Sequence, residues 1–205
     1  MLTRRALFAT ASATLFWPIN VFGKGTFVGR VVAEWLPDNR NMRLLEPFEF
    51  IGPDGRRWPV PAGTTVDGAS IPQAFWSITG GPFEGAYRSA SVVHDYYCVT
   101  RTRRHRDVHK VFYDGMLASG VGDKRAWLMY QAVERFGPSW DDPKVDPRCE
   151  IVDANYDFEL CARNSRKPTV RRRDPSPAEL EGFLNEIAKE ADVNDVRLLR
   201  EAAKK

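Results

Sequence analysis

The sequence predicts an α+β domain in which a small antiparallel sheet packs with a layer of three helices, followed by a C-terminal helical tail. Short bursts of alternating apolar and polar residues come first, between residues 27 and 61. Three segments with apolar residues at helical spacing follow, between residues 87 and 136. Because 43% of the 205 residues are hydrophobic and 12% are aromatic, the chain can form a genuine core.

The charge balance makes nucleic acid an unexpected partner. The chain has 30 basic and 27 acidic residues, a formal net charge of +3. Residues 1–23 contain two arginines and no acid, so residues 24–205 hold 28 basic and 27 acidic residues and carry +1. Such a near balance does not predict the broad cationic surface of a nucleic-acid-binding protein.

Residues 1–23 are expected to be an export signal. Arg4 and Arg5 precede an apolar run from Ala6 to Trp17, a layout that resembles the twin-arginine export motif. The general secretory route remains an alternative. The run is shorter than the roughly 20 residues of a membrane-spanning helix, so no stable span is expected after cleavage near Gly23. The mature protein is therefore expected in the periplasm or outside the cell.

The predicted strands lie at Phe27–Val32, Met42–Leu45, Phe48–Ile51 and residues 57–60. Gly52–Gly55 is a plausible hairpin turn between the last two, because glycine, proline and aspartate favour turn conformations. The Gly/Pro/Ser/Thr-rich stretch after them, residues 63–85, also contains large apolar side chains. It is expected to be an ordered, packed loop.

Three helices are predicted at Tyr87–Val99, Arg104–Ser119 and Lys124–Phe136. The last is expected to end at Gly137-Pro138, since proline cannot continue a helix. These helices complete a domain spanning residues 24–145.

A Pro/Arg-rich connecting segment, residues 146–175, and a helical tail, residues 176–205, are predicted beyond this domain. Ser176, Pro177 and Glu179 form the capping-box pattern of a helix start. The apolar face of this helix is expected to dock or to find a partner, and peripheral contact with a membrane is one alternative.

Cys98, Cys149 and Cys161 are an odd number of cysteines for an exported protein. We expect Cys149 and Cys161 to form a disulfide, because they flank a compact Pro-rich segment. Cys98 lies in an apolar helical stretch and is expected to be a buried thiol.

The three histidines of the chain, His94, His105 and His109, all fall in the first two predicted helices. His105 and His109 are four residues apart and project from one helix face, a spacing at which two imidazoles can share a divalent metal such as zinc. His94 and Asp95 could add ligands from the neighbouring helix. We therefore take His94, Asp95 and His109 as the candidate metal ligands. The alternative for His105 is an exposed position in a basic turn.

Asp67, Ser70, His94 and Asp95 are the candidate catalytic residues. His94 and Asp95 lie inside an apolar run, where burial is costly without a specific partner. They are therefore either hydrogen-bonded within the helical layer or part of a site that activates water. A Ser70-His94-Asp95 triad is disfavoured, because adjacent residues on a helix point about 100° apart.

The chain resembles the bacterial and phage family catalogued as domain of unknown function 1353. The similarity lies in residues 61–72, in Trp76, in residues 91–97, and in Phe112, Met116, Gly120-Val121 and residues 136–140, and it covers about Phe48 to Trp140. It implies a small α+β domain whose activity is not established, with Asp67, Ser70, His94 and Asp95 in its two polar motifs. His109 stands where members of the family are expected to have an aspartate.

Two functions remain open at this point. One is an exported hydrolase, with or without a divalent metal, acting on cell-envelope or other extracytoplasmic material. The other is a binding or phage-type assembly module without enzymatic activity, in which the Asp/His motifs form a structural network. Side chains that face a solvent-reachable pocket would favour the enzyme, whereas mutually bonded, closed side chains would favour the module.

Overall fold

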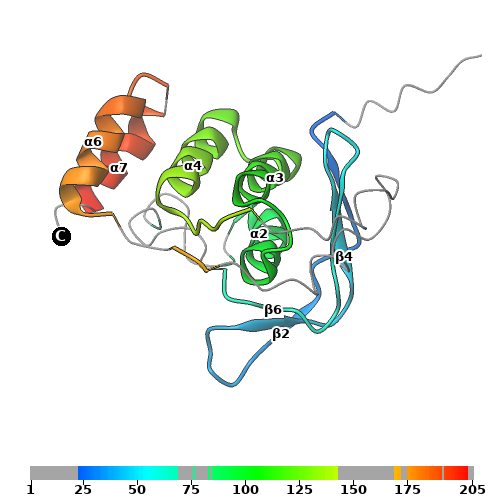
Figure 1. The fold of residues 1–205 in the computed structure, drawn as a ribbon. Helices are drawn as coiled ribbons and strands as arrows, with labels where there is room; N and C mark the ends of the chain where they lie inside the picture. Colours follow the sequence, from blue (N-terminus) through cyan, green and yellow to red (C-terminus); the bar gives the residue numbers. More distant parts are fainter. Residues whose placement is uncertain are drawn as a thin grey trace, which may run out of the picture.

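A computed structural model describes residues 23–68, 76, 83, 85–142, 169–171, 175–190 and 192–202. The export segment up to residue 22, Ser70, Cys149 and Cys161 lie outside the described residues. The model confirms the α+β fold class, with two small antiparallel sheets instead of one. A layer of helices lies between the strands and a C-terminal helix pair (Figure 1).

The first sheet contains the predicted hairpin. Its strand order is β1-β4-β5, formed by β1 (Thr26–Val28), β4 (Phe48–Ile51) and β5 (Arg57–Val60). Phe50 pairs with Trp58 across the hairpin, and both side chains are buried. Gly55 adopts a φ of +79° in the turn, a conformation that side chains other than glycine rarely adopt.

The second sheet has the order β2-β3-β6, formed by β2 (Ala33–Trp35), β3 (Met42–Leu44) and β6 (Thr65–Val66). The sequence did not predict β2 or β6. Strand β6 begins the stretch that was expected to be a loop, and Val66 pairs with Met42. The pairing fixes the residues that directly follow β6, Asp67 and Gly68, beside the helical layer.

The helical layer consists of α2 (Arg88–Thr100), α3 (His105–Ala118) and α4 (Asp123–Phe136), each within one residue of its predicted bounds. Every residue from Ala90 to Cys98 is buried, so α2 is covered on all sides. Helices α2 and α3 lie in close contact at Gly115. A Cβ atom added to this glycine would lie only 2.9 Å from the Cβ of Ala90.

The C-terminal helices are α6 (Pro177–Ile187) and α7 (Val193–Ala202), and the predicted capping box at Ser176 is present. The apolar face of α6 packs against the helical layer, with the rings of Phe183 and Phe136 5.4 Å apart. This agrees with the expectation that the tail docks, and the apolar side chains of the face are buried: Leu180, Phe183, Leu184 and Ile187. No helix among the described residues is long and apolar enough to span a membrane.

Candidate functional site: a buried Asp/His network

Asp95 connects α2 to the chain that follows β6. Its Oδ2 atom accepts a hydrogen bond of 2.7 Å from the backbone N–H of Gly68, and its side chain is only 2% exposed. Gly68 has a φ of +62°, which favours glycine at this position. The carboxylate therefore holds the loop against the helix at a point where the chain turns sharply.

His94 points to a different neighbour, His109 of α3. His94 Nε2 lies 3.0 Å from His109 Nδ1, and both side chains are 1% exposed. A ring N–H of His109 also donates to the backbone carbonyl of Pro138. Because Nδ1 of His109 faces His94, the bond to Pro138 uses Nε2, and the neutral ring accepts from His94 at Nδ1. The chain of bonds thus links α2, α3 and the segment after α4.

The surroundings of His109 keep its ring neutral. Burial, the larger cause, and the nearby His105 together lower the pKa of His109 from 6.5 to about 3. His105 does share a helix face with His109, as predicted, with ring centroids 5.9 Å apart. It is half-buried against Trp140 and not fully exposed in the basic turn. At neutral pH, His109 is a hydrogen-bonding group without charge.

Cys98 is a buried thiol, as the sequence predicted. Its Sγ atom lies 3.8 Å from Nδ1 and 3.7 Å from Nε2 of His94, one helical turn earlier. Phe112 covers the same imidazole, with ring centroids 4.9 Å apart. His94 is therefore enclosed by a thiol, an aromatic ring and a second imidazole.

Asp67 differs from these residues in being accessible. Its carboxylate is 38% exposed and lies 4.0 Å from the guanidinium of Arg40. The structure thus separates the predicted catalytic residues: His94 and Asp95 are closed, and Asp67 reaches solvent one residue before Gly68. Ser70 lies outside the described residues.

The three predicted metal ligands are not brought to one point. Asp95 is directed to Gly68, whereas His94 and His109 bond to each other. Across the part of the chain that the structure describes, no three His, Cys, Asp or Glu side chains form a group that could hold a metal ion. The donor set present here fits a hydrogen-bond network better than a metal centre.

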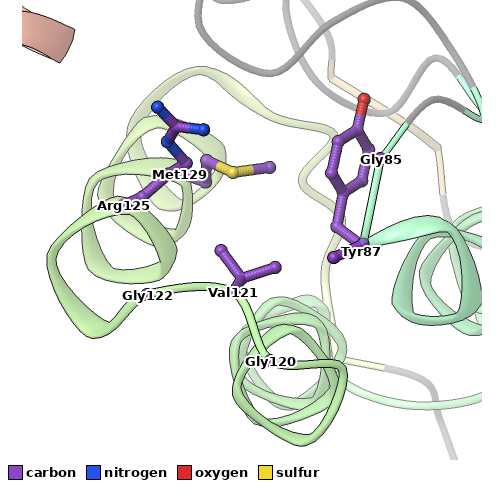
Figure 2. A pocket seen from close by; sticks show the side chains of 8 residues that line it. Gly85, Tyr87, Gly120, Val121, Gly122, Arg125 and Met129 are labelled. Carbon is purple, nitrogen blue, oxygen red and sulfur yellow. The ribbon is translucent and has the colours of Figure 1, made fainter.

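A cavity of about 330 Å³ lies elsewhere, between the start of α2 and the start of α4. Figure 2 shows Tyr87 on one side, Arg125 and Met129 on the other, and Val121 between them. None of the predicted site residues lines it, and Arg125 is not among those predicted residues. The sequence feature that could have indicated this cavity is the pair of glycines at positions 120 and 122, in the turn before α4.

A family model described as protein of unknown function (DUF1353) matches residues 42–133, from β3 into α4. The chain is 43% identical over 161 residues to uncharacterized protein y4jT of Sinorhizobium fredii (strain NBRC 101917 / NGR234), covering 74% of this chain and 48% of that protein. It is 37% identical over 118 residues to uncharacterized protein y4iH of the same strain, covering 57% of this chain and 49% of that protein.

The family match supports the resemblance derived from the motifs, and it includes Asp67, His94, Asp95 and His109. The chain spans about half the length of both curated relatives. No solved structure matches the chain.

Proposed function

We propose that this chain is a binding or assembly module without enzymatic activity, in which His94, Asp95 and His109 form a structural network. The observation that best supports this is their burial: the side chains are 1–2% exposed, and each bonds to another protein group. A catalytic side chain must reach its substrate. Neither of the two cavities described for the molecule is lined by any of these residues.

Isosteric substitutions test this proposal. A structural network predicts that Asp95→Asn and His94→Gln each lower the free energy of unfolding by about 1–3 kcal/mol, because each leaves a buried partner without a good bond. Asp67→Asn is the control and should change it by less than about 0.5 kcal/mol, since that carboxylate is partly exposed. Urea unfolding measures all three.

The opposite result would favour an enzyme. Catalytic groups are often retained at a cost in stability, so their replacement tends to be neutral or stabilising. If Asp95→Asn and His94→Gln unfold at the same urea concentration as the unmodified protein or a higher one, the network is not structural and the proposal fails.

The second candidate is a hydrolase acting on cell-envelope material. It is favoured by Asp67, an accessible carboxylate one residue from the N–H that binds Asp95. In this alternative Asp67, Ser70, His94 and Asp95 activate water. In the same alternative, His94, Asp95 and His109 are the residues that would hold a divalent metal such as zinc, and the metal would supply Lewis-acid chemistry.

Metal content distinguishes the two candidates. The protein should be purified without a metal-binding tag and analysed for elements beside a His94→Ala/His109→Ala double variant. Near-stoichiometric metal that is lost in the double variant would support the hydrolase. The module predicts no stoichiometric metal in either sample.

We also propose that residues 1–23 direct export by the twin-arginine route, so that the module acts in the periplasm or outside the cell. The support is the arginine pair before an acid-free apolar run. Fused to a reporter that is active only after export, residues 1–30 should export it, and Arg4→Lys/Arg5→Lys should abolish this. Export that tolerates the lysine pair would indicate the general secretory route, and an inactive unmodified fusion would refute export.

A further inference from the structure

The cavity beside Arg125 has the features of a ligand site. Its volume of about 330 Å³ lies within the usual range for small-molecule pockets. Tyr87, Val121 and Met129 contribute the apolar part of its lining, and Arg125 is its charged side chain. Figure 2 shows the guanidinium at the edge of the space and Val121 between the two walls. A ligand that fits would have an apolar body and an acceptor group at one end.

Arg125 is held in position for such a ligand. Asp195 of α7 accepts from Nη2 at 2.9 Å and from Nε at 3.3 Å, and this carboxylate is itself buried. Among the described residues, no partner bonds to Nη1, so its N–H groups and the second N–H of Nη2 are available to donate side by side. The bond to Asp195 raises the pKa of Arg125, so the guanidinium stays charged.

Gly122 keeps the wall of the cavity open. Its φ of −60° suits any residue, and a Cβ atom there would meet nothing within 4 Å. Neither backbone strain nor crowding therefore requires a glycine at this position. A side chain there would extend into open space at the border of this cavity and of a second hollow lined by Gly122 and Asp195.

We propose that this cavity binds a small carboxylic acid with an apolar body, the carboxylate accepting from Arg125 and the body lying between Tyr87 and Met129. A planar carboxylate suits the fork geometry of a guanidinium. This inference rests on the proposed binding function and names its ligand class. The acid is either a free small molecule or the C-terminus of a peptide ending in an apolar residue.

Binding of matched probes to the full-length protein tests the ligand class. We expect phenylacetate to bind with a Kd on the order of 1 mM, as befits a probe of about ten heavy atoms. Phenylacetamide, a neutral isostere, and 2-phenylethylamine, a cation, should bind about tenfold more weakly or not at all. NMR titration measures these affinities. Equal binding of all three would overturn the carboxylate assignment.

Two glycine variants test the location. Gly122→Leu should fill the cavity and abolish phenylacetate binding. Gly182→Leu, at a helical glycine where a Cβ would also meet nothing within 4 Å, should leave binding unchanged, since Gly182 does not line the cavity. Circular dichroism checks that both variants are folded. Binding that survives in a folded Gly122→Leu variant would overturn the location.

Arg125→Lys tests the fork without leaving Asp195 unpaired. A lysine keeps the charge but cannot bind a carboxylate with two parallel N–H groups, so phenylacetate affinity should fall about fivefold. An unchanged affinity would overturn the role of Arg125.

A peptide probe distinguishes a free acid from the C-terminus of a peptide. The tripeptide Ala-Ala-Phe with a free C-terminus should bind more tightly than phenylacetate if the ligand is a peptide end, and amidation should abolish that gain. Weaker binding of the tripeptide supports a free acid.

The urea experiments distinguish a failure of the ligand proposal from a failure of the proposed function. If no acid binds but Asp95→Asn and His94→Gln are destabilised, the ligand class is wrong and the module stands. If the probe is chemically changed, the module itself is wrong.

Discussion

At the scale of single residues, the centre of the molecule depends on one imidazole, His109, that must stay neutral. His94 donates to His109, which can accept at Nδ1 only while it lacks a proton there. Protonating His109 would replace an acceptor by a donor and place a charge where water does not reach. The network therefore ties the stability of the fold to the protonation state of one side chain.

This predicts a loss of stability in mild acid. The pKa of His109 is about 3 in the folded protein, against 6.5 when unperturbed, so the unfolded state binds the proton more readily between these values. The contribution of His109 to stability should be constant well above pH 6.5 and fall by about 1.4 kcal/mol per pH unit well below it, measured by urea unfolding from pH 7 to pH 5. His109→Asn should remove this slope, whereas His105→Gln should keep it. An equal slope in the His109 variant would refute the prediction.

At the scale of secondary-structure elements, the helices were predictable and part of the strand pairing was not. Helices α2, α3 and α4 repeat their apolar residues over thirteen or fourteen positions, which gives a strong local signal. Strand β6 has two residues, and its partner β3 lies more than twenty positions earlier. A strand that short gains its stability from its partner, so its own sequence cannot reveal it.

The candidate site was also predictable only in part. The apolar run around His94 and Asp95 marked these side chains as costly to bury, and the structure places both of them in the buried network. Their partners include the N–H of Gly68 and the carbonyl of Pro138, which are backbone groups. Every non-proline residue has both a donor and an acceptor in its backbone, so sequence does not distinguish the one that will be used.

The contact between α2 and α3 yields a prediction about Gly115. Alanine normally favours a helix over glycine by about 1 kcal/mol. At Gly115, however, the new Cβ would lie 2.9 Å from the Cβ and 3.3 Å from the Cα of Ala90, so the helices must separate. Gly115→Ala should therefore lower the free energy of unfolding by about 1–3 kcal/mol. Urea unfolding measures the change.

Gly182→Ala is the matched control, because Gly182 is helical and open on its outer side. It should raise stability by about 0.5–1 kcal/mol. Similar stabilities for the two variants would show that α2 and α3 are not in close contact at Gly115.

At the scale of the whole molecule, the C-terminal helices complete the core of the helical layer. Phe183 packs on Phe136 of α4, and the ion pair of Asp195 with Arg125 joins α7 to the same helix. Figure 1 shows both C-terminal helices beside α4. In the sequence, the predicted connecting segment, residues 146–175, lies between α4 and these helices. In space, the helices lie beside α4. Their apolar faces belong to the same hydrophobic cluster as α4.

The last prediction follows from this shared core. If the C-terminal helices and the helical layer form one cooperative unit, unfolding followed by tryptophan fluorescence and by far-UV circular dichroism should give one coincident transition. Phe183→Ala should lower the midpoint of that whole transition, at a cost of about 3–5 kcal/mol, because it leaves a cavity against Phe136. Lys189→Ala, at an exposed position after α6, should not shift it. An early, separate transition that alone responds to Phe183→Ala would show instead that the tail folds independently of the domain.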